Sequence, residues 1–83
     1  MKCYIATFHT HLAAMKTWRA LLAAGVSAEM APVPRALSAD CGACVRFEAE
    51  TPCTACMHAD FDRIVIAQAE GEYQTVVEND DAP

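Results

Sequence analysis

Long apolar runs are missing from this 83-residue chain. The longest, Ala20 to Val26, is far shorter than the roughly 20 apolar residues that a membrane-spanning helix needs. Lys16 and Arg19 interrupt any apolar core of a secretion signal near the N-terminus. We therefore expect a cytoplasmic protein with no membrane partner.

Basic residues are also scarce, because six Lys and Arg stand against eleven Asp and Glu and give a net charge of -5. Nucleic-acid sites are built from clustered Lys and Arg, so the charge argues against a nucleic-acid partner. The sequence also lacks a phosphate-binding loop, a hydrolase triad and a paired-carboxylate site. No familiar enzyme class is indicated.

What the sequence has in quantity is cysteine, with five residues. Cytoplasmic thiols are kept reduced, and clustered cysteines there more often bind metal or do chemistry than form structural disulfides. Because five is odd, any pairing scheme leaves at least one thiol over. We therefore look for function among the cysteines.

The length and composition predict one small folded domain. An apolar fraction of 54% with 20% charged residues favours folding over disorder. We expect a single compact domain over residues 1–78, followed by a disordered acidic tail over residues 79–83. Since the core of so small a domain contributes only about 3–5 kcal/mol, we also expect a homo-oligomer.

The hydrophobic pattern predicts an α+β fold. Alternating apolar residues indicate strands at residues 2–8, 26–33, 43–49 and 73–77. Two helices are expected between them. The resulting order, βαββαβ, is typical of a two-layer ferredoxin-like sandwich, in which two helices cover one face of an antiparallel sheet.

Start and stop signals define the two predicted helices. The first begins near Thr10 and ends at Gly25, and the second opens at Thr51-Pro52 and runs to about residue 70. Helical spacing within the first predicts that Leu12, Met15, Trp18 and Leu22 face the core. The rest of the predicted core is Tyr4, Phe8 and Ile64.

Four of the cysteines form two C-x-x-C motifs, Cys41/Cys44 and Cys53/Cys56, with eight residues between them. One interpretation is a four-thiolate site for zinc or another thiophilic ion, although ribbon-type sites usually separate their pairs by about 15–20 residues. A second is a dithiol that exchanges disulfides through Cys53 and Cys56. Cys3, on a predicted core strand, is instead expected to be a small buried hydrophobe.

The third interpretation is a reactive thiol. Cys41 lies in the sequence between Arg35 and Arg46, and either cation can stabilise a thiolate or a persulfide anion if the fold brings it close. Cys53 would lie in the first turn of the second helix, where free backbone N–H groups favour a thiolate. The histidines His9, His11 and His58 are expected to be exposed or capping residues, since the sequence pairs none with a carboxylate.

One segment, residues 34–47, has a distinctive pattern: Pro34-Arg35, Leu37-Ser38 and Cys41-Gly42-x-x-x-Arg46. In this pattern the chain resembles a family of small bacterial proteins of unknown function that is described as putative Se/S carrier protein-like. The similarity covers most of residues 3–77 and is loosest after Ala49. The pair Cys53 and Cys56 is not part of the family pattern.

The resemblance implies a small α/β domain in which Cys41 is the carrier thiol and Cys44 an accessory thiol. Our first hypothesis is therefore a sulfur or selenium carrier rather than an enzyme. Cys41 would accept a persulfide or perselenide from a donor protein and pass it to an acceptor protein, with Cys44 as resolving thiol and Arg35 and Arg46 stabilising the anion. The alternatives remain a metal-binding module, with Cys41, Cys44, Cys53 and Cys56 as ligands, and a dithiol redox protein.

Overall fold

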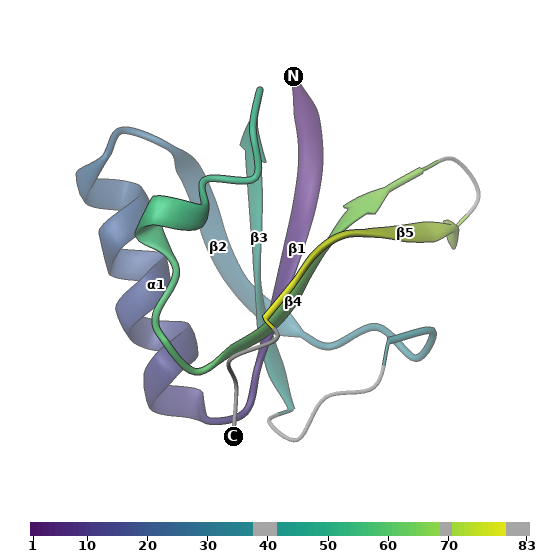
Figure 1. Cartoon of the computed structure of the whole chain (residues 1–83), viewed down its shortest axis with the longest axis horizontal. Helices are drawn as coiled ribbons and strands as arrows, with labels where there is room; N and C mark the ends of the chain where they lie inside the picture. Colours follow the sequence, from purple (N-terminus) through teal and green to yellow (C-terminus); the bar gives the residue numbers. More distant parts are fainter. Residues whose placement is uncertain (38–41, 69–70, 80–83) are drawn as a thin grey trace.

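A five-stranded antiparallel sheet with a helix against one face dominates the computed structural model, which describes residues 1–37, 42–68 and 71–79 (Figure 1). The elements, in chain order, are β1 (Lys2–Phe8), α1 (His11–Ala23), β2 (Ser27–Pro32), β3 (Ala43–Ala49), the 3-10 turn η1 (Thr54–Cys56), β4 (Phe61–Ala67) and β5 (Tyr73–Glu78). The spatial order β2-β3-β1-β4-β5 makes β1 the central strand. An α+β fold with an antiparallel sheet is thus confirmed.

Local signals in the sequence place the first helix correctly. The Thr10 side chain accepts a hydrogen bond from the Ala13 N–H (3.2 Å), which satisfies one of the donors left free at the start of α1. At the other end Gly25 adopts φ 81, in the left-handed region that glycine enters without steric cost. This helix is not long and apolar enough to cross a membrane, and the described part of the chain has no other that is.

The predicted buried face of α1 is wrong in part: Trp18 packs against the helix-face core as predicted, but Leu12 and Leu22 do not. The buried residues are Ala13, Ala14, Thr17 and Leu21, whereas Leu12 is 58% exposed and Leu22 is 45% exposed. Ala13, Ala14 and Thr17 on the inner face let the helix approach the sheet closely, with Leu21 as the large apolar side chain on that face and Leu12 and Leu22 outside it. A pattern based on large apolar residues alone therefore misplaced Leu12 and Leu22.

The predicted second helix is also wrong, and with it the two-helix ferredoxin-like topology. Thr51-Pro52 opens no α-helix, and residues 61–67 form β4. The run Ile64-Val65-Ile66 is β-branched, which favours a strand, and β1 offers a long antiparallel partner in which Tyr4 lies opposite Ile66. The long-range pairing overrides the helix-start signal.

Alternation along β1 directs side chains to two different clusters. The helix face of the sheet carries Tyr4, Phe8, Phe47 and Ile64, with the Tyr4 and Phe47 rings stacked at 5.4 Å between centroids. The opposite face, here the loop face, carries Ile5, Cys44 and Val65, with Leu37 packed over them. The loop that follows β2 therefore covers part of the face opposite α1.

The end of β5 is held in place by Asn79. Its side-chain Nδ2 donates to the carbonyl oxygens of Ala59 and Phe61, both at 2.8 Å. Asn79 is the first residue of the predicted acidic tail, and residues 80–83 of that tail lie outside the described residues.

We expect the isolated chain to self-associate. Within the described residues β2 and β5 each have a strand neighbour on one side, and such sheet edges can pair with another chain. Exposed apolar side chains, Leu12, Leu22 and Val76, add surface that association would cover. Sedimentation equilibrium over a range of concentrations measures this, and a strictly monomeric chain at high concentration would contradict it.

Candidate thiol site at one end of the sheet

The antiparallel register brings three strand ends together. Thr7, near the end of β1, lies opposite Cys44 in β3 and opposite Arg63 in β4. The Val33 N–H donates to the Gly42 carbonyl oxygen (3.2 Å), so the ladder between β2 and β3 extends to Gly42. Cys41 itself lies outside the described residues, but it directly precedes Gly42 in the sequence.

Leu37 anchors the loop that leads to Cys41. The Leu37 N–H donates to the Pro34 carbonyl oxygen (3.0 Å), which forms a turn, and the Leu37 side chain is 6% exposed against Ile5, Cys44 and Val65. The Pro-x-x-Leu spacing thus has a structural role that the sequence did not reveal: it holds the loop against the loop face.

Gly42 leaves the end of β3 open. Among the described residues, its chain neighbour excepted, no heavy atom lies within 4 Å of the place that a Cβ atom would take at this position. Gly42 is exposed, whereas Cys44, two residues later, is buried. The backbone next to Cys41 is therefore accessible to an approaching molecule on this side.

Cys44 is the buried member of the first C-x-x-C motif. It is 0% exposed, and its thiol donates to the Pro32 carbonyl oxygen over 3.7 Å. A large reagent cannot reach this sulfur unless the loop above it moves.

The two predicted arginines occupy different positions. Arg35 is exposed in the loop before Cys41. Arg46 lies four residues beyond Gly42 along β3, about 13 Å by strand geometry, and its Nη1 pairs with Glu29 Oε1 at 3.6 Å. Arg35 is thus the predicted cation whose charge has no ion-pair partner among the described residues.

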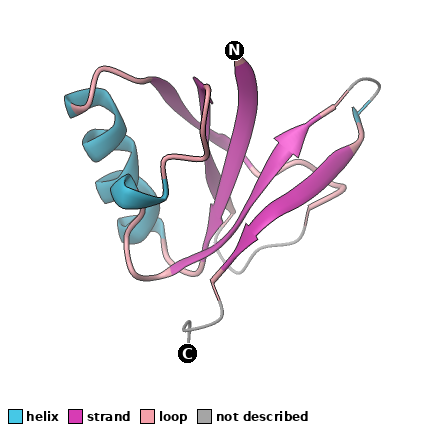
Figure 2. Cartoon of the chain, turned by 45° about the horizontal axis from the view of Figure 1, so that its top comes forward, coloured by secondary structure: helices cyan, strands magenta, loops and turns pink. Residues whose placement is uncertain are grey.

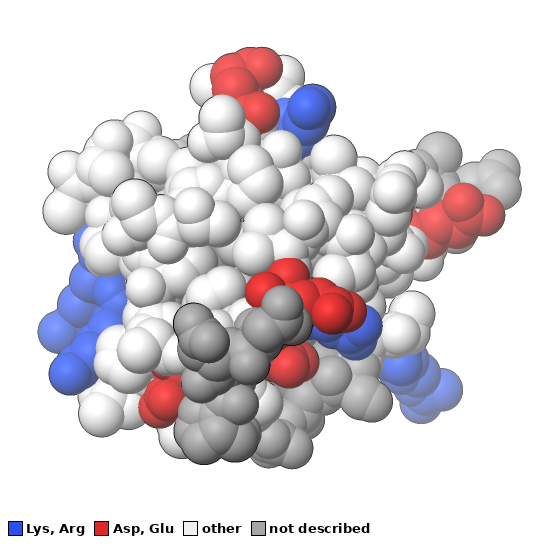
Figure 3. Space-filling model, in the orientation of Figure 1, with Lys and Arg blue, Asp and Glu red and all other residues white. Residues whose placement is uncertain are grey.

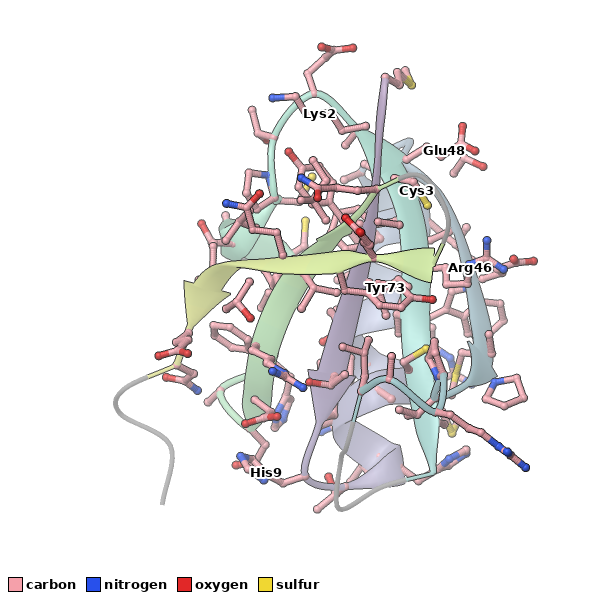
Figure 4. All side chains as sticks on the ribbon, turned by 90° about the vertical axis from the view of Figure 1, so that its right-hand side faces the viewer. Lys2, Cys3, His9, Arg46, Glu48 and Tyr73 are labelled. Atoms are coloured by element: carbon pink, nitrogen blue, oxygen red, sulfur yellow. The ribbon has the colours of Figure 1, made fainter. Side chains whose placement is uncertain are left out.

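Arg46 and Cys3 share a separate cavity. This cavity, about 260 Å³, is lined by Cys3, Ser27, Ala28, Glu29, Arg46, Phe47 and Glu48. In Figure 4 the Cys3, Glu48 and Arg46 side chains lie on the same side, and His9 lies at the other end of the sheet. Cys3 is half-buried at this cavity, so the expectation of a fully buried Cys3 is wrong.

A hydroxyl, a carboxylate and an imidazole meet where β1 ends and β4 begins. The Thr7 hydroxyl donates to Asp62 Oδ2 (3.1 Å), and Asp62 Oδ1 lies 3.9 Å from His9 Nε2. Sequence reasoning gave His9 no carboxylate partner, because 53 positions separate it from Asp62 and the β1–β4 pairing was not predicted. The pair lies at the same end of the sheet as Gly42.

Arg63 is a second residue that sequence reasoning missed. Cys44, Thr7 and Arg63 occupy one row across β3, β1 and β4, and the alternation of β4 places Arg63 on the loop face. The Arg63 Nε is buried and has no hydrogen-bond partner among the described residues. This row brings a cation to within about two strand spacings, or roughly 10 Å, of Cys44.

The second C-x-x-C motif lies on the other face of the sheet. Cys53 and Cys56 are half-buried and pack against the helix-face cluster, whereas Cys44 belongs to the loop-face cluster. The sheet thus separates Cys44 from Cys53 and Cys56. In residues 1–37, 42–68 and 71–79, no group of three or more His, Cys, Asp or Glu side chains has an arrangement that could hold a metal ion.

Comparison with known proteins gives a family and no individual relative. No curated protein and no solved structure matches the chain. A family model described as "Putative Se/S carrier protein-like" matches residues 3–60. That range includes β1, α1, β2, the Leu37 anchor, Gly42, β3 and both C-x-x-C motifs. The chain belongs to the putative Se/S carrier protein-like family.

Proposed function

We propose that this protein carries sulfur or selenium on Cys41 between a donor and an acceptor protein. The observation that carries the proposal is the family match over residues 3–60, which contains Cys41 directly before the open backbone at Gly42. Cys3, Cys53 and Cys56 are free thiols, as expected for a protein in the reducing cytoplasm.

The transfer chemistry needs no external oxidant. The Cys41 thiolate attacks the outer sulfur of a donor persulfide, R–S–SH, and forms a new S–S bond. The donor S–S bond breaks, R–S⁻ leaves, and the transferred sulfur keeps its proton. An acceptor thiolate then attacks the same outer sulfur and releases Cys41 as a thiolate. A donor perselenide would transfer its outer selenium by the same two displacements.

Nearby residues take supporting roles in this proposal. Arg35 stabilises the anion formed on Cys41, and Arg46 contributes less because Glu29 already neutralises it. The imidazole of His9, beside Asp62, accepts the thiol proton. Cys44 resolves a persulfide that finds no acceptor, by attacking the inner sulfur and releasing HS⁻ with formation of a Cys41–Cys44 disulfide.

We expect Cys41 to be the first thiol modified by a limiting amount of alkylating reagent at neutral pH. The neighbouring backbone is open at Gly42, and a cation such as Arg35 favours the reactive thiolate. Buried Cys44 should react last. Peptide mapping of the reduced, native chain measures the order, and labelling of Cys3 before Cys41 would contradict the proposal.

A matched pair of variants tests, in the same alkylation assay, how much each arginine's charge contributes to the reactivity of Cys41. Arg35→Gln should slow alkylation of Cys41 by about two- to fivefold, the range expected for one exposed charge pair. Arg46→Gln, whose guanidinium is paired with Glu29, should have the smaller effect. If Arg46→Gln slows the reaction more, the anion is stabilised from β3 and not from the loop.

A further inference from the structure

We propose that Cys53 and Cys56 form a second thiol site, a dithiol that exchanges disulfides with small, uncharged disulfides. This activity is separate from the carrier function and does not rest on Cys41. Four features of the described residues carry it: the turn that joins the two cysteines, the backbone of Cys53, the contacts that hold the turn, and its position on the sheet.

The turn brings the two cysteines close together. The Cys56 N–H donates to the Cys53 carbonyl oxygen (3.0 Å) across Thr54 and Ala55. A hydrogen-bonded turn of this kind places its first and fourth Cα atoms within about 7 Å, and disulfides join Cα atoms about 4.4–6.8 Å apart. Both side chains pack against the same helix-face cluster.

The backbone of Cys53 adopts an unusual conformation. Its φ of 54 and ψ of 43 lie in the left-handed region, and it is the one residue other than glycine with positive φ in the described part of the chain. A β-carbon in this region costs free energy, so the conformation persists where the surrounding structure holds it. Here it places the Cys53 carbonyl oxygen where it accepts from the Cys56 N–H, while the Cys53 thiol donates to the Thr51 carbonyl oxygen (3.5 Å) and must leave that bond to pair with Cys56.

Contacts with α1 hold the turn in place. The His58 N–H donates to the Thr17 hydroxyl (2.9 Å), and Thr17 is 1% exposed on the inner face of the helix. Figure 2 shows the short turn η1 lying beside α1. The dithiol is therefore attached to a rigid element, which reduces the entropy lost when the two sulfurs pair.

The position of the turn separates it from the candidate thiol site and leaves it accessible. Cys53 and Cys56 are half-buried on the helix face, opposite Cys44 on the loop face. In Figure 3, which shows the side of the molecule with η1, the surface around this turn carries neither Lys and Arg nor Asp and Glu. A neutral disulfide can therefore approach without desolvating a charged side chain.

The proposed reaction balances as a two-electron exchange. One of the two thiolates attacks a sulfur of R–S–S–R, the disulfide bond breaks, and R–S⁻ leaves. The second cysteine, as a thiolate, attacks the protein sulfur of this mixed disulfide, forms the Cys53–Cys56 bond and releases another R–S⁻. The protein loses two thiol protons, which pass to the two R–S⁻ groups, and the small disulfide is reduced to two R–SH.

The test uses the full chain carrying Cys41→Ser, equilibrated with 2-hydroxyethyl disulfide and its thiol without oxygen. Mass spectrometry and peptide mapping should find an intramolecular disulfide between Cys53 and Cys56. The equilibrium constant for its formation should be at least about tenfold larger in the native chain than in the same chain in urea, because the native turn pre-organises the pair. The thermal midpoint should therefore be higher after oxidation.

Single variants provide the matched controls. In the Cys41→Ser background, Cys53→Ser and Cys56→Ser should each stop at a mixed disulfide on the remaining cysteine of the pair, whereas Cys3→Ser should leave the Cys53–Cys56 disulfide unchanged. Mixed disulfides alone on the native chain, or an equilibrium constant no larger than in urea, would overturn the proposal. Because Cys41 is absent throughout, neither result bears on the carrier function.

Discussion

Replacement of Cys41 by serine is expected to abolish uptake of sulfur from a small alkyl persulfide. The wild-type chain should gain the mass of one sulfur atom, and mapping should place it on Cys41. In Cys41→Ser the extent of loading should fall by at least about 100-fold, because a serine hydroxyl stays protonated at neutral pH and is a much weaker nucleophile than a thiolate. Intact mass after rapid quenching measures the loading.

The controls are the other accessible cysteines. Cys3, Cys53 and Cys56 are half-buried free thiols like many on protein surfaces, so Cys3→Ser and the double variant Cys53→Ser/Cys56→Ser should load as the wild type does. Undiminished loading of Cys41→Ser, with the added sulfur on Cys3 or on Cys53, would remove Cys41 as the carrier thiol. The result does not depend on stability, provided that each variant keeps its cooperative thermal transition.

The sequence identified the motif but not the surroundings of the candidate site. Cys41, Gly42 and the arginines could be found because they are neighbours in the chain. Asp62 and Arg63 could not, because they reach this end of the sheet through the pairing of β4 with β1, which local propensity does not specify. The ion pair of Arg46 with Glu29 was missed for the same reason: it spans two strands.

The fold was predictable to the extent that local signals agreed with long-range contacts. Four strands and the first helix were predicted within a residue or two, because alternation, the Thr10 cap and Gly25 all favour what the tertiary structure requires. Between residues 51 and 70 the local sequence signals conflict with the long-range contacts. Thr51-Pro52 is a good helix start, but the β-branched run in β4 completes the sheet beside β1, and burial of Ile64 and Val65 outweighs the local signal.

The phase of α1, that is, which of its side chains face the sheet, was predicted only in part. Alanines contribute little to a hydrophobic pattern, yet Ala13 and Ala14 are fully buried and set how closely α1 packs on the sheet. Once they define the inner face, Leu21 is brought inside and its neighbour Leu22 is turned outward. These adjacent leucines therefore provide a direct test of the phase.

Leu21→Ala is expected to lower the free energy of unfolding by about 2–5 kcal/mol, a large part of the stability of a domain this size. Leu21 is 0% exposed, so truncation leaves a cavity, whereas Leu22→Ala removes a side chain that is 45% exposed and should change the free energy by no more than about 0.5 kcal/mol. Both variants keep a strong helix former, so intrinsic helix propensity cancels in the comparison. Urea unfolding followed by Trp18 fluorescence measures both.

If Leu21→Ala does not fold, Leu21→Val and Leu22→Val preserve the contrast with a smaller loss of stability, since valine carries the same helix penalty at both positions. Equal losses at the two positions, or a larger loss at Leu22, would mean that α1 packs on the sheet through the face that carries Leu12 and Leu22.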